Sequence, residues 1–350
     1  MREITIDGHT VKDGSPAYIV ADIGHNHAGE MWRLEEMVEA AKAAGVNAVK
    51  FQTREPKEVY SPIEYYRKSR NVQWMDETYG IHREKLEWSP EEWKHVFEFC
   101  KTSGITAFST PFDFRSLDLL ISLNVPAVKI ASGDATNLPL IRAAASHGLP
   151  LIISTGGCNI SEVDNIVEAM QKSSTPFALL QCSCIYPAPH DVLNIKVIEQ
   201  YRKRYPEIQT GLSTHDPEIH PTIAAFALGG RIFEHHFTAN RRWKGTDNAF
   251  SLTPVMMKEL RSNLDDVFLA FGSGNKKQAP RERSYTEERR KGLYWANSRP
   301  QGSLINEGDI KIQCPEGGVL PDAIGSFMGR TISVSVSAGT EVRNEDVDGG

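Results

Sequence analysis

Short apolar segments alternate with amphipathic segments over the first 271 residues. Eight segments rich in Val, Ile and Ala predict strands at 17–22, 46–52, 105–110, 126–131, 150–155, 176–183, 208–213 and 231–237. The spacing between them predicts helices, among them 31–44, 161–170 with Ser161 expected at its N-cap, 221–228 and, after the last strand, 254–271. This order predicts an α/β fold, a (β/α)8 TIM barrel.

Four segments depart from this repeat. Residues 4–11 predict a hairpin around Asp7-Gly8 that closes the bottom of the barrel. An insertion at 56–88, rich in Tyr, Arg and Trp, is of the length typical of lids or subunit contacts. After the barrel domain, 1–271, we expect a polar linker at 272–292 and a small domain of short strands and turns at 293–350.

The composition favours a globular protein and argues against nucleic-acid binding and a disulfide framework. Of the 350 residues 40% are hydrophobic and 24% charged, which is typical of a globular chain, and a net charge of −6 argues against a nucleic-acid surface. Five cysteines without a CxxC pair favour reduced thiols over a disulfide framework. The first residues lack a signal-peptide pattern and no segment has the length of a membrane span, so we expect a cytoplasmic protein.

Two histidines follow successive predicted strands. His215 lies at the end of 208–213, His236 at the end of 231–237, and Asp247 a short loop later. Because the carboxyl ends of barrel strands meet at one rim, these imidazoles could share a divalent metal, although either histidine alone would more often be structural. An enzyme is therefore the leading hypothesis.

The other strand ends carry ionisable and hydroxyl side chains. They supply Asp22, Lys50, Gln52, Thr110, Lys129, Ser132, Ser154, Thr155, Ser183 to Tyr186 and Ser213. A lysine in a barrel mouth is costly without an anionic partner, so the two lysines predict a bound phosphate or carboxylate. The serines and the neighbouring Gly133, Gly156 and Gly157 offer hydroxyl and backbone donors for such an anion, while each serine alone could simply satisfy a turn.

Ordered motifs over nearly the whole chain resemble the sialic acid synthase family, whose members condense phosphoenolpyruvate with an aldose to a 2-keto-3-deoxy sugar acid. The matching segments are residues 19–29, 49–53, 108–112, 128–133, 153–156, 185–187, 211–215, 234–238 and 245–247. The tail resembles the small antifreeze-like (SAF) domain that completes the partner's active site in domain-swapped family homodimers. The resemblance implies a transferase that uses phosphoenolpyruvate and an aldose and binds Mn²⁺ or Mg²⁺. From the net charge and the lack of an apolar span we expect no nucleic-acid or membrane partner.

The resemblance also implies roles for individual residues. Phosphoenolpyruvate would be held by Lys50, Thr110, Lys129, Ser132, Ser154 and Ser213, and the metal by His215 and His236. Asp22 and Asp247 would orient sugar hydroxyls or move protons, Tyr186 would shape the pocket, and Gln52 would contact the acceptor. Glu234, two residues before His236, could orient a metal-bound water.

Three positions depart from the family pattern. Asp22 replaces a glutamate, Cys184 replaces an asparagine amide, and Cys314 replaces the arginine that contacts the N-acyl group of the sugar. We therefore expect an acceptor other than N-acetylmannosamine. Alternatively, Arg299 or Lys311 takes the place of the missing arginine.

Two other functions compete with this interpretation. His25-Asn26-His27 imitates the HxH motif of metal-dependent hydrolases built on the same barrel, although the matching histidines on the fifth and sixth strands are absent. If they do not bind a metal, His25 and His27 have a structural role and shape the loop. The second alternative is a degenerate, non-catalytic relative that binds a sugar acid or serves as a scaffold, in view of the three departures.

Overall fold

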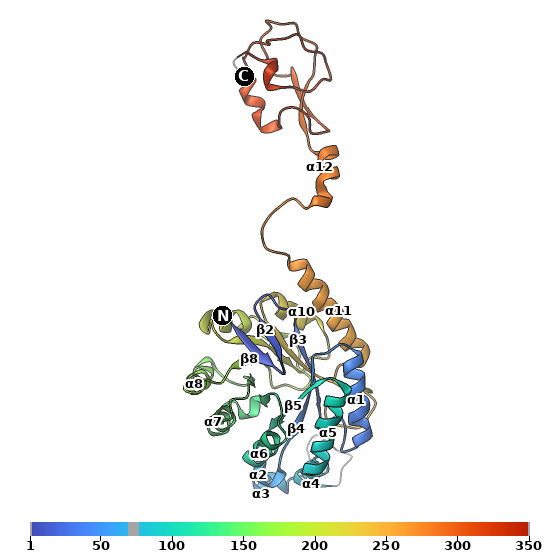
Figure 1. Ribbon diagram of the computed structural model, residues 1–350, viewed down its shortest axis with the longest axis vertical. Coiled ribbons are helices and arrows are strands. Elements are labelled where there is room, and N and C mark those ends of the chain that lie inside the picture. Colours follow the sequence, from blue (N-terminus) through green and yellow to red (C-terminus); the bar gives the residue numbers. More distant parts are fainter. Residues whose placement is uncertain (1, 69–76, 349–350) are drawn as a thin grey trace. The chain divides into compact units, whose positions relative to one another are not determined.

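The computed structural model describes residues 2–68 and 77–348, which divide into two compact units at Gly272/Ser273. The first unit is built on a closed barrel of eight parallel strands, ordered along the chain, with the last pairing back onto the first (Figure 1). The strands are β3 (Tyr18–Gly24), β4 (Ala48–Thr53), β5 (Thr106–Pro111), β6 (Val128–Ile130), β7 (Leu151–Ser154), β8 (Phe177–Gln181), β9 (Gln209–Thr214) and β10 (Ile232–His236). The predicted barrel is confirmed, and most predicted strands exceed the observed ones by a residue or more at one end.

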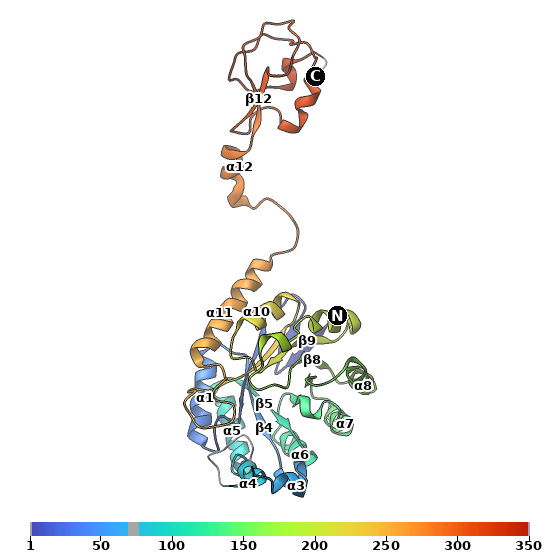
Figure 2. The same ribbon diagram turned by 180° about the vertical axis from the view of Figure 1, so that it is seen from behind.

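Helices surround the barrel, as Figure 2 shows from behind. They are α1 (Met31–Ala43), α5 (Pro90–Ser103), α6 (Phe114–Ser122), α7 (Leu138–Ser146), α8 (Ile160–Gln171), α9 (Val197–Arg204), α10 (His220–Ala227) and α11 (Pro254–Phe271). Their apolar stripes are buried: Leu34, Met37 and Val38 of α1 are fully buried against the barrel. The expected N-cap of α8 is wrong, because the Asn159 side chain accepts the Glu162 N–H and Ser161 lies inside the helix.

The inward-facing side chains of the strands change from apolar to polar along the barrel axis. Val20, Ala48, Phe108, Ile152 and Ile232 belong to one buried cluster inside the barrel. The residues two positions further along the same strands point to the same face and are polar: Asp22, Lys50, Thr110, Ser154 and Glu234. The apolar layers therefore support a polar layer at the carboxyl ends of the strands.

The N-terminal hairpin closes the other end. Strands β1 (Glu3–Ile6) and β2 (His9–Lys12) pair antiparallel, and their turn residues Asp7 and Gly8 both have positive φ, as a tight two-residue turn requires. Ile4, Ile6 and Val11 join the cluster inside the barrel, which also holds the first or second residues of several strands. The predicted hairpin at the barrel bottom is confirmed.

The insertion after β4 contains short helices: α2 (Pro56–Val59), α3 (Pro62–Tyr65) and α4 (Tyr79–Glu84). A Cβ on Gly80 would lie 2.2 Å from the Tyr65 ring, so α4 approaches α3 as closely as only glycine allows. The part of the predicted insertion at 69–76 lies outside the described residues.

The second unit has a core of its own. It contains α12 (Arg283–Arg289), the antiparallel pair β11 (Gly292–Trp295) and β12 (Ile310–Gln313), and short 3-10 helices at 280–282, 321–326 and 344–346. Leu293, Trp295, Phe327 and Ile332 are buried together, and the Trp295 indole N–H donates to Asp346 at 3.0 Å. Among the described residues no helix combines the length and apolarity needed to cross a bilayer.

Candidate active site

A pocket of about 830 Å³ opens at the carboxyl ends of the barrel strands. The residues to which the sequence analysis assigned roles line it, namely Asp22, Lys50, Gln52, Thr110, Lys129, Ser132, Ser154, Tyr186, Ser213, His215, Glu234, His236 and Asp247. Thr155 and Ser183, also expected at strand ends, do not line it, because their hydroxyls donate to the carbonyls of Leu180 and Val192. A cavity in which several ionisable groups converge is a common feature of enzyme sites. The β/α topology brings these residues together from positions more than two hundred apart in sequence.

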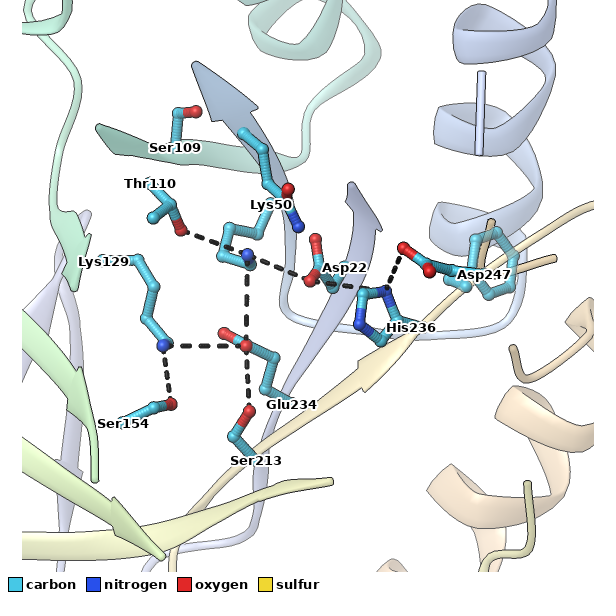
Figure 3. A network of polar contacts seen from close by, with 12 residues as sticks. Asp22, Lys50, Ser109, Thr110, Lys129, Ser154, Ser213, Glu234, His236 and Asp247 are labelled. Carbon is cyan, nitrogen blue, oxygen red and sulfur yellow. Dashed lines mark hydrogen bonds and ion pairs between the residues drawn. The ribbon is translucent and has the colours of Figure 1, made fainter. Parts of the chain in front are cut away.

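The Lys50 ammonium group contacts side chains from three other strands, β3, β5 and β10. Its Nζ lies 3.0 Å from Asp22 Oδ2, donates to Thr110 Oγ1 at 3.2 Å and lies 4.0 Å from Glu234 Oε1 (Figure 3). Burial alone would lower the pKa of Lys50, but the two carboxylates raise it above its usual value. Lys50 is therefore a fixed cation, with Thr110 and Asp22 placed by the neighbouring strands.

Lys129 forms a second cation on the same network (Figure 3). Its Nζ donates to Ser154 Oγ at 2.6 Å and lies 3.8 Å from Glu234 Oε1, which also accepts a hydrogen bond from Ser213 at 3.1 Å. Burial lowers the pKa of Lys129, and Glu234 partly offsets this. Asp22 and Glu234 are protein carboxylates already in contact with the lysines, so they supply part of the negative charge that the lysines require, and the bound phosphate or carboxylate stays a prediction.

Ser132, Gly156 and Cys184 lie beside Lys129's end of the pocket. The Gly156 N–H donates to Ser132 Oγ at 2.9 Å, and a Cβ on Gly156 would lie 2.6 Å from Cys184 Sγ. Cys184 is exposed, and a hydrogen bond with Cys182, helped by Ser132 and the Lys129 charge, lowers its pKa to about 6. The thiol at position 184 therefore has anionic character at neutral pH.

The two predicted metal ligands face each other. The ring centroids of His215 and His236 are 5.3 Å apart, and the Tyr186 ring stacks on His215 at 3.8 Å. His215 Nδ1 lies 2.8 Å from the Ser183 carbonyl, to which it must donate, so its Nε2 carries the lone pair. Burial lowers the pKa of His215 to about 3, with His236 adding to the shift, so this imidazole is neutral, the form that binds metals.

Carboxylates surround His236. Its Nδ1 lies 3.6 Å from Asp22 Oδ2 and 3.9 Å from Asp247 Oδ2 (Figure 3). His236 Nδ1 and Asp22 Oδ1 are buried without a hydrogen-bond partner. Three or more His, Cys, Asp or Glu side chains do not converge as a ready-made metal cage in the described part of the chain. The donor set fits an ion held by two imidazoles, with its other positions open to water and substrate.

The HxH interpretation of the first loop is wrong. His25 lies 2.8 Å from the guanidinium groups of both Arg54 and Arg83, which would repel a cation. His27 is fully buried, stacks on Trp88 at 4.2 Å and accepts the Gly29 N–H, and burial lowers its pKa to about 3. The pair therefore shapes the loop and does not form a hydrolase metal site.

Sequence reasoning missed several lining residues. Arg54, which follows β4, and Phe250 were not singled out, and the insertion that carries Arg83 of α4 was expected only to be a lid or a subunit contact. The alternation of Lys50, Gln52 and Arg54 is the signal that could have found Arg54, because alternate residues of an extended strand face one side. Nothing comparable in the sequence indicates Phe250.

Comparison with known proteins gives consistent matches. The model of the NeuB family matches residues 37–276. Human N-acetylneuraminate-9-phosphate synthase is 30% identical over 97% of this chain and 95% of its own. N,N'-diacetyllegionaminic acid synthase of Legionella pneumophila is 32% identical over 95% and 94%. The solved structure of a sialic acid synthetase from Leptospira borgpetersenii, in complex with citrate, is 29% identical, with a TM-score of 0.73 over 82% of this chain and 95% of that one.

Proposed function

Because the chain belongs to the NeuB family, we propose that it condenses phosphoenolpyruvate with an aldose to give a 2-keto-3-deoxy sugar acid. The observation that carries this proposal is the single pocket in which two buried lysines lie beside a pair of facing imidazoles. An anion and an aldehyde can be held there next to each other.

The lysine end is the site for phosphoenolpyruvate. Lys50 and Lys129 supply fixed positive charge, and Thr110, Ser132, Ser154 and Ser213 supply hydroxyl groups around them. The carboxylates of Asp22 and Glu234 favour the charged form of the lysines and orient them. An incoming phosphate takes over part of their hydrogen bonds.

The imidazole end is the site for a divalent ion, Mn²⁺ or Mg²⁺. His215 and His236 would hold it, and Asp22 and Asp247 would favour its charge. When bound there, the ion supplies Lewis acidity that polarises the aldehyde of the acceptor.

The chain's own groups then serve each step of the reaction. C3 of phosphoenolpyruvate forms the new bond to the aldehyde carbon, water adds to C2, and the C2–O bond to phosphate breaks. Lys129 and Ser154 stabilise the charge of the leaving phosphate. Asp22 and Asp247 orient the acceptor's hydroxyl groups and move protons, Gln52 contacts the acceptor, and the Tyr186 ring holds His215 in place.

The acceptor differs from N-acetylmannosamine in this proposal. Cys314 stands where an acyl-contacting arginine is expected, and its thiol donates to the Arg289 carbonyl at 3.2 Å. Arg299, the alternative replacement, is held within the second unit by Asp309 and the Leu304 carbonyl. The relatives carry names of different sugar-acid products, which fits a family whose acceptors vary. We further assign the second unit as an antifreeze-like domain that serves a partner's site in a homodimer.

Incubation with phosphoenolpyruvate, Mn²⁺ and a panel of aldoses, with phosphate release as the measurement, tests the reaction. We expect turnover with at least one aldose other than N-acetylmannosamine, its loss with a chelator and its return with Mn²⁺. His236→Ala should lower kcat/KM by about 100-fold or more, whereas His147→Ala, exposed at the end of α7, should not. No release with any aldose, or full turnover by His236→Ala, would contradict the assignment, and preference for N-acetylmannosamine would contradict the acceptor.

A further inference from the structure

A second group of basic side chains lines the pocket and has no role in the reaction as described. Arg54 follows β4, His25 follows β3, and His82 and Arg83 come from α4 of the insertion. The Arg54 and Arg83 guanidinium groups each lie 2.8 Å from a different ring nitrogen of His25. Arg83 also donates to the Tyr79 hydroxyl at 2.9 Å. Three separate segments therefore bring these side chains to one place.

The hydrogen bonding within this group is mismatched. A neutral imidazole has one N–H and one lone pair, and an imidazolium has two N–H groups. Both nitrogens of His25 face guanidinium donors, so at least one contact sets N–H against N–H. His82 is only 5% exposed, and neither of its ring nitrogens has a hydrogen-bond partner among the described residues. Oxygen acceptors are what this group lacks.

The charges of the group are also unbalanced. Glu87 is the nearby carboxylate, 3.8 Å from both Arg54 Nε and His25 Nε2. Burial raises the pKa of Glu87 to about 7, so its charge is incomplete at neutral pH. Within residues 2–68 and 77–348, no carboxylate forms an ion pair with Arg83. Among the described residues, Glu87 is therefore the one carboxylate within ion-pair distance of these guanidinium groups, and the Asp134 carboxylate acts on Arg54 only from a longer distance, so the two positive charges are only partly balanced.

The position of the group places it on the path of the substrate. Lys50, Gln52 and Arg54 face the same side of one extended segment, and Gln52 Oε1 accepts from Arg54 Nη2 at 2.8 Å. Lys50 and Arg54 are four residues apart, about 13 Å along an extended strand. A substrate that reacts between the lysines and the imidazoles can therefore reach the arginines with its far end.

We propose that Arg54, Arg83, His25 and His82 form a subsite for the phosphate group of an aldose phosphate, the acceptor in the condensation proposed above. Guanidinium groups bind phosphate with paired hydrogen bonds, and three terminal oxygens can satisfy donors that a neutral sugar hydroxyl cannot. The inference rests on the proposed function and specifies its substrate class.

Paired substrates test the subsite: mannose with mannose 6-phosphate, and N-acetylmannosamine with its 6-phosphate. In the wild-type protein kcat/KM should favour the phosphate ester of at least one pair by about 100-fold, and in Arg83→Met this ratio should fall below about 5. Arg83 is half-buried, so the change should be tolerated, and circular dichroism checks folding. Arg142→Met, exposed on α7, is the matched control and should keep the wild-type ratio.

Calorimetric titration separates this proposal from the proposed function. If mannose 6-phosphate binds the wild type and not Arg83→Met while no aldose gives turnover, the subsite is supported and the condensation is overturned. Equal kcat/KM for both members of each pair overturns the subsite and leaves the condensation intact. A hexuronate preferred over the phosphate esters overturns the phosphate subsite. So does a loss of phosphoenolpyruvate affinity in Arg83→Met with an unchanged kcat/KM ratio between the paired substrates, since the arginines would then bind phosphoenolpyruvate.

Discussion

At the residue scale, Cys184 has the most distinctive chemistry of the pocket. It replaces an amide expected from the family pattern, and its thiol is exposed beside Ser132 and Lys129. The hydrogen bond with Cys182 and the nearby cation favour the thiolate, while the same hydrogen bond raises the pKa of Cys182 well above its usual value. A single residue thus adds negative charge where the proposal places phosphoenolpyruvate.

Alkylation by iodoacetamide should report this thiolate. Because the pKa of Cys184 is lowered to about 6, its labelling rate should rise with pH, reach half its maximum near pH 6 and level off above it. The labelling rate of an ordinary thiol reaches half its maximum near pH 8.5, which is about 2.5 pH units higher. Peptide mass spectrometry follows the modification, phosphoenolpyruvate should slow it, and Cys184→Ser should abolish it. A midpoint near pH 8.5 would show that the thiol is not activated.

The sequence predicted which residues reach the pocket but not how they pair. Lys50 and Lys129 follow from strand position alone, because the carboxyl ends of all eight strands share one rim. Their pairing with Asp22 and Glu234 depends on the stagger of neighbouring strands, which sets Asp22 beside Lys50 and Glu234 beside Ser213. A single sequence does not specify that stagger. Arg83 could not be placed for a similar reason, since it reaches the pocket from an insertion without a repeat.

At the element scale, the N-terminal hairpin contributes to the stability of the barrel that carries the site. Ile4, Ile6 and Val11 are buried among the first interior residues of the strands, whereas Thr5 and Thr10 point to solvent and meet at 3.0 Å. The Asp7-Gly8 pair, typical of a tight two-residue turn, is what made the hairpin predictable. Helix ends were less predictable, because Asn159 and Ser161 are both good N-caps and only the course of the chain decides between them.

Ile6→Ala should therefore destabilise the first unit although Ile6 lies at the end of the barrel opposite the pocket. Removing a fully buried isoleucine side chain costs about 2–5 kcal/mol, and the rigid barrel interior can collapse only partly around the cavity. Urea unfolding gives the free energy of unfolding, with exposed Thr5→Ala as a control expected to change it by less than about 0.5 kcal/mol. Equal effects of the two substitutions would mean that the hairpin does not close the barrel.

At the scale of the whole molecule, two units with separate cores raise the question of what the second one does. The first unit carries every residue assigned to the pocket, and the second has its own buried cluster around Trp295 and Phe327. The proposed homodimer gives the second unit a role, because there it would complete the acceptor site of the other chain.

Subunit complementation tests that arrangement. Residues 1–272 alone have an intact pocket but no second unit, and full-length Lys129→Ala has a second unit but a damaged pocket. Each should be nearly inactive alone, while mixed dimers should regain phosphate release, because the intact barrel then receives its partner's second unit. A truncated chain that also carries Lys129→Ala is the control and should restore nothing. If mixed dimers form, as native mass spectrometry would show, yet remain inactive, the units do not act across the dimer. If the truncated chain turns over like the full chain, the second unit is not needed for catalysis.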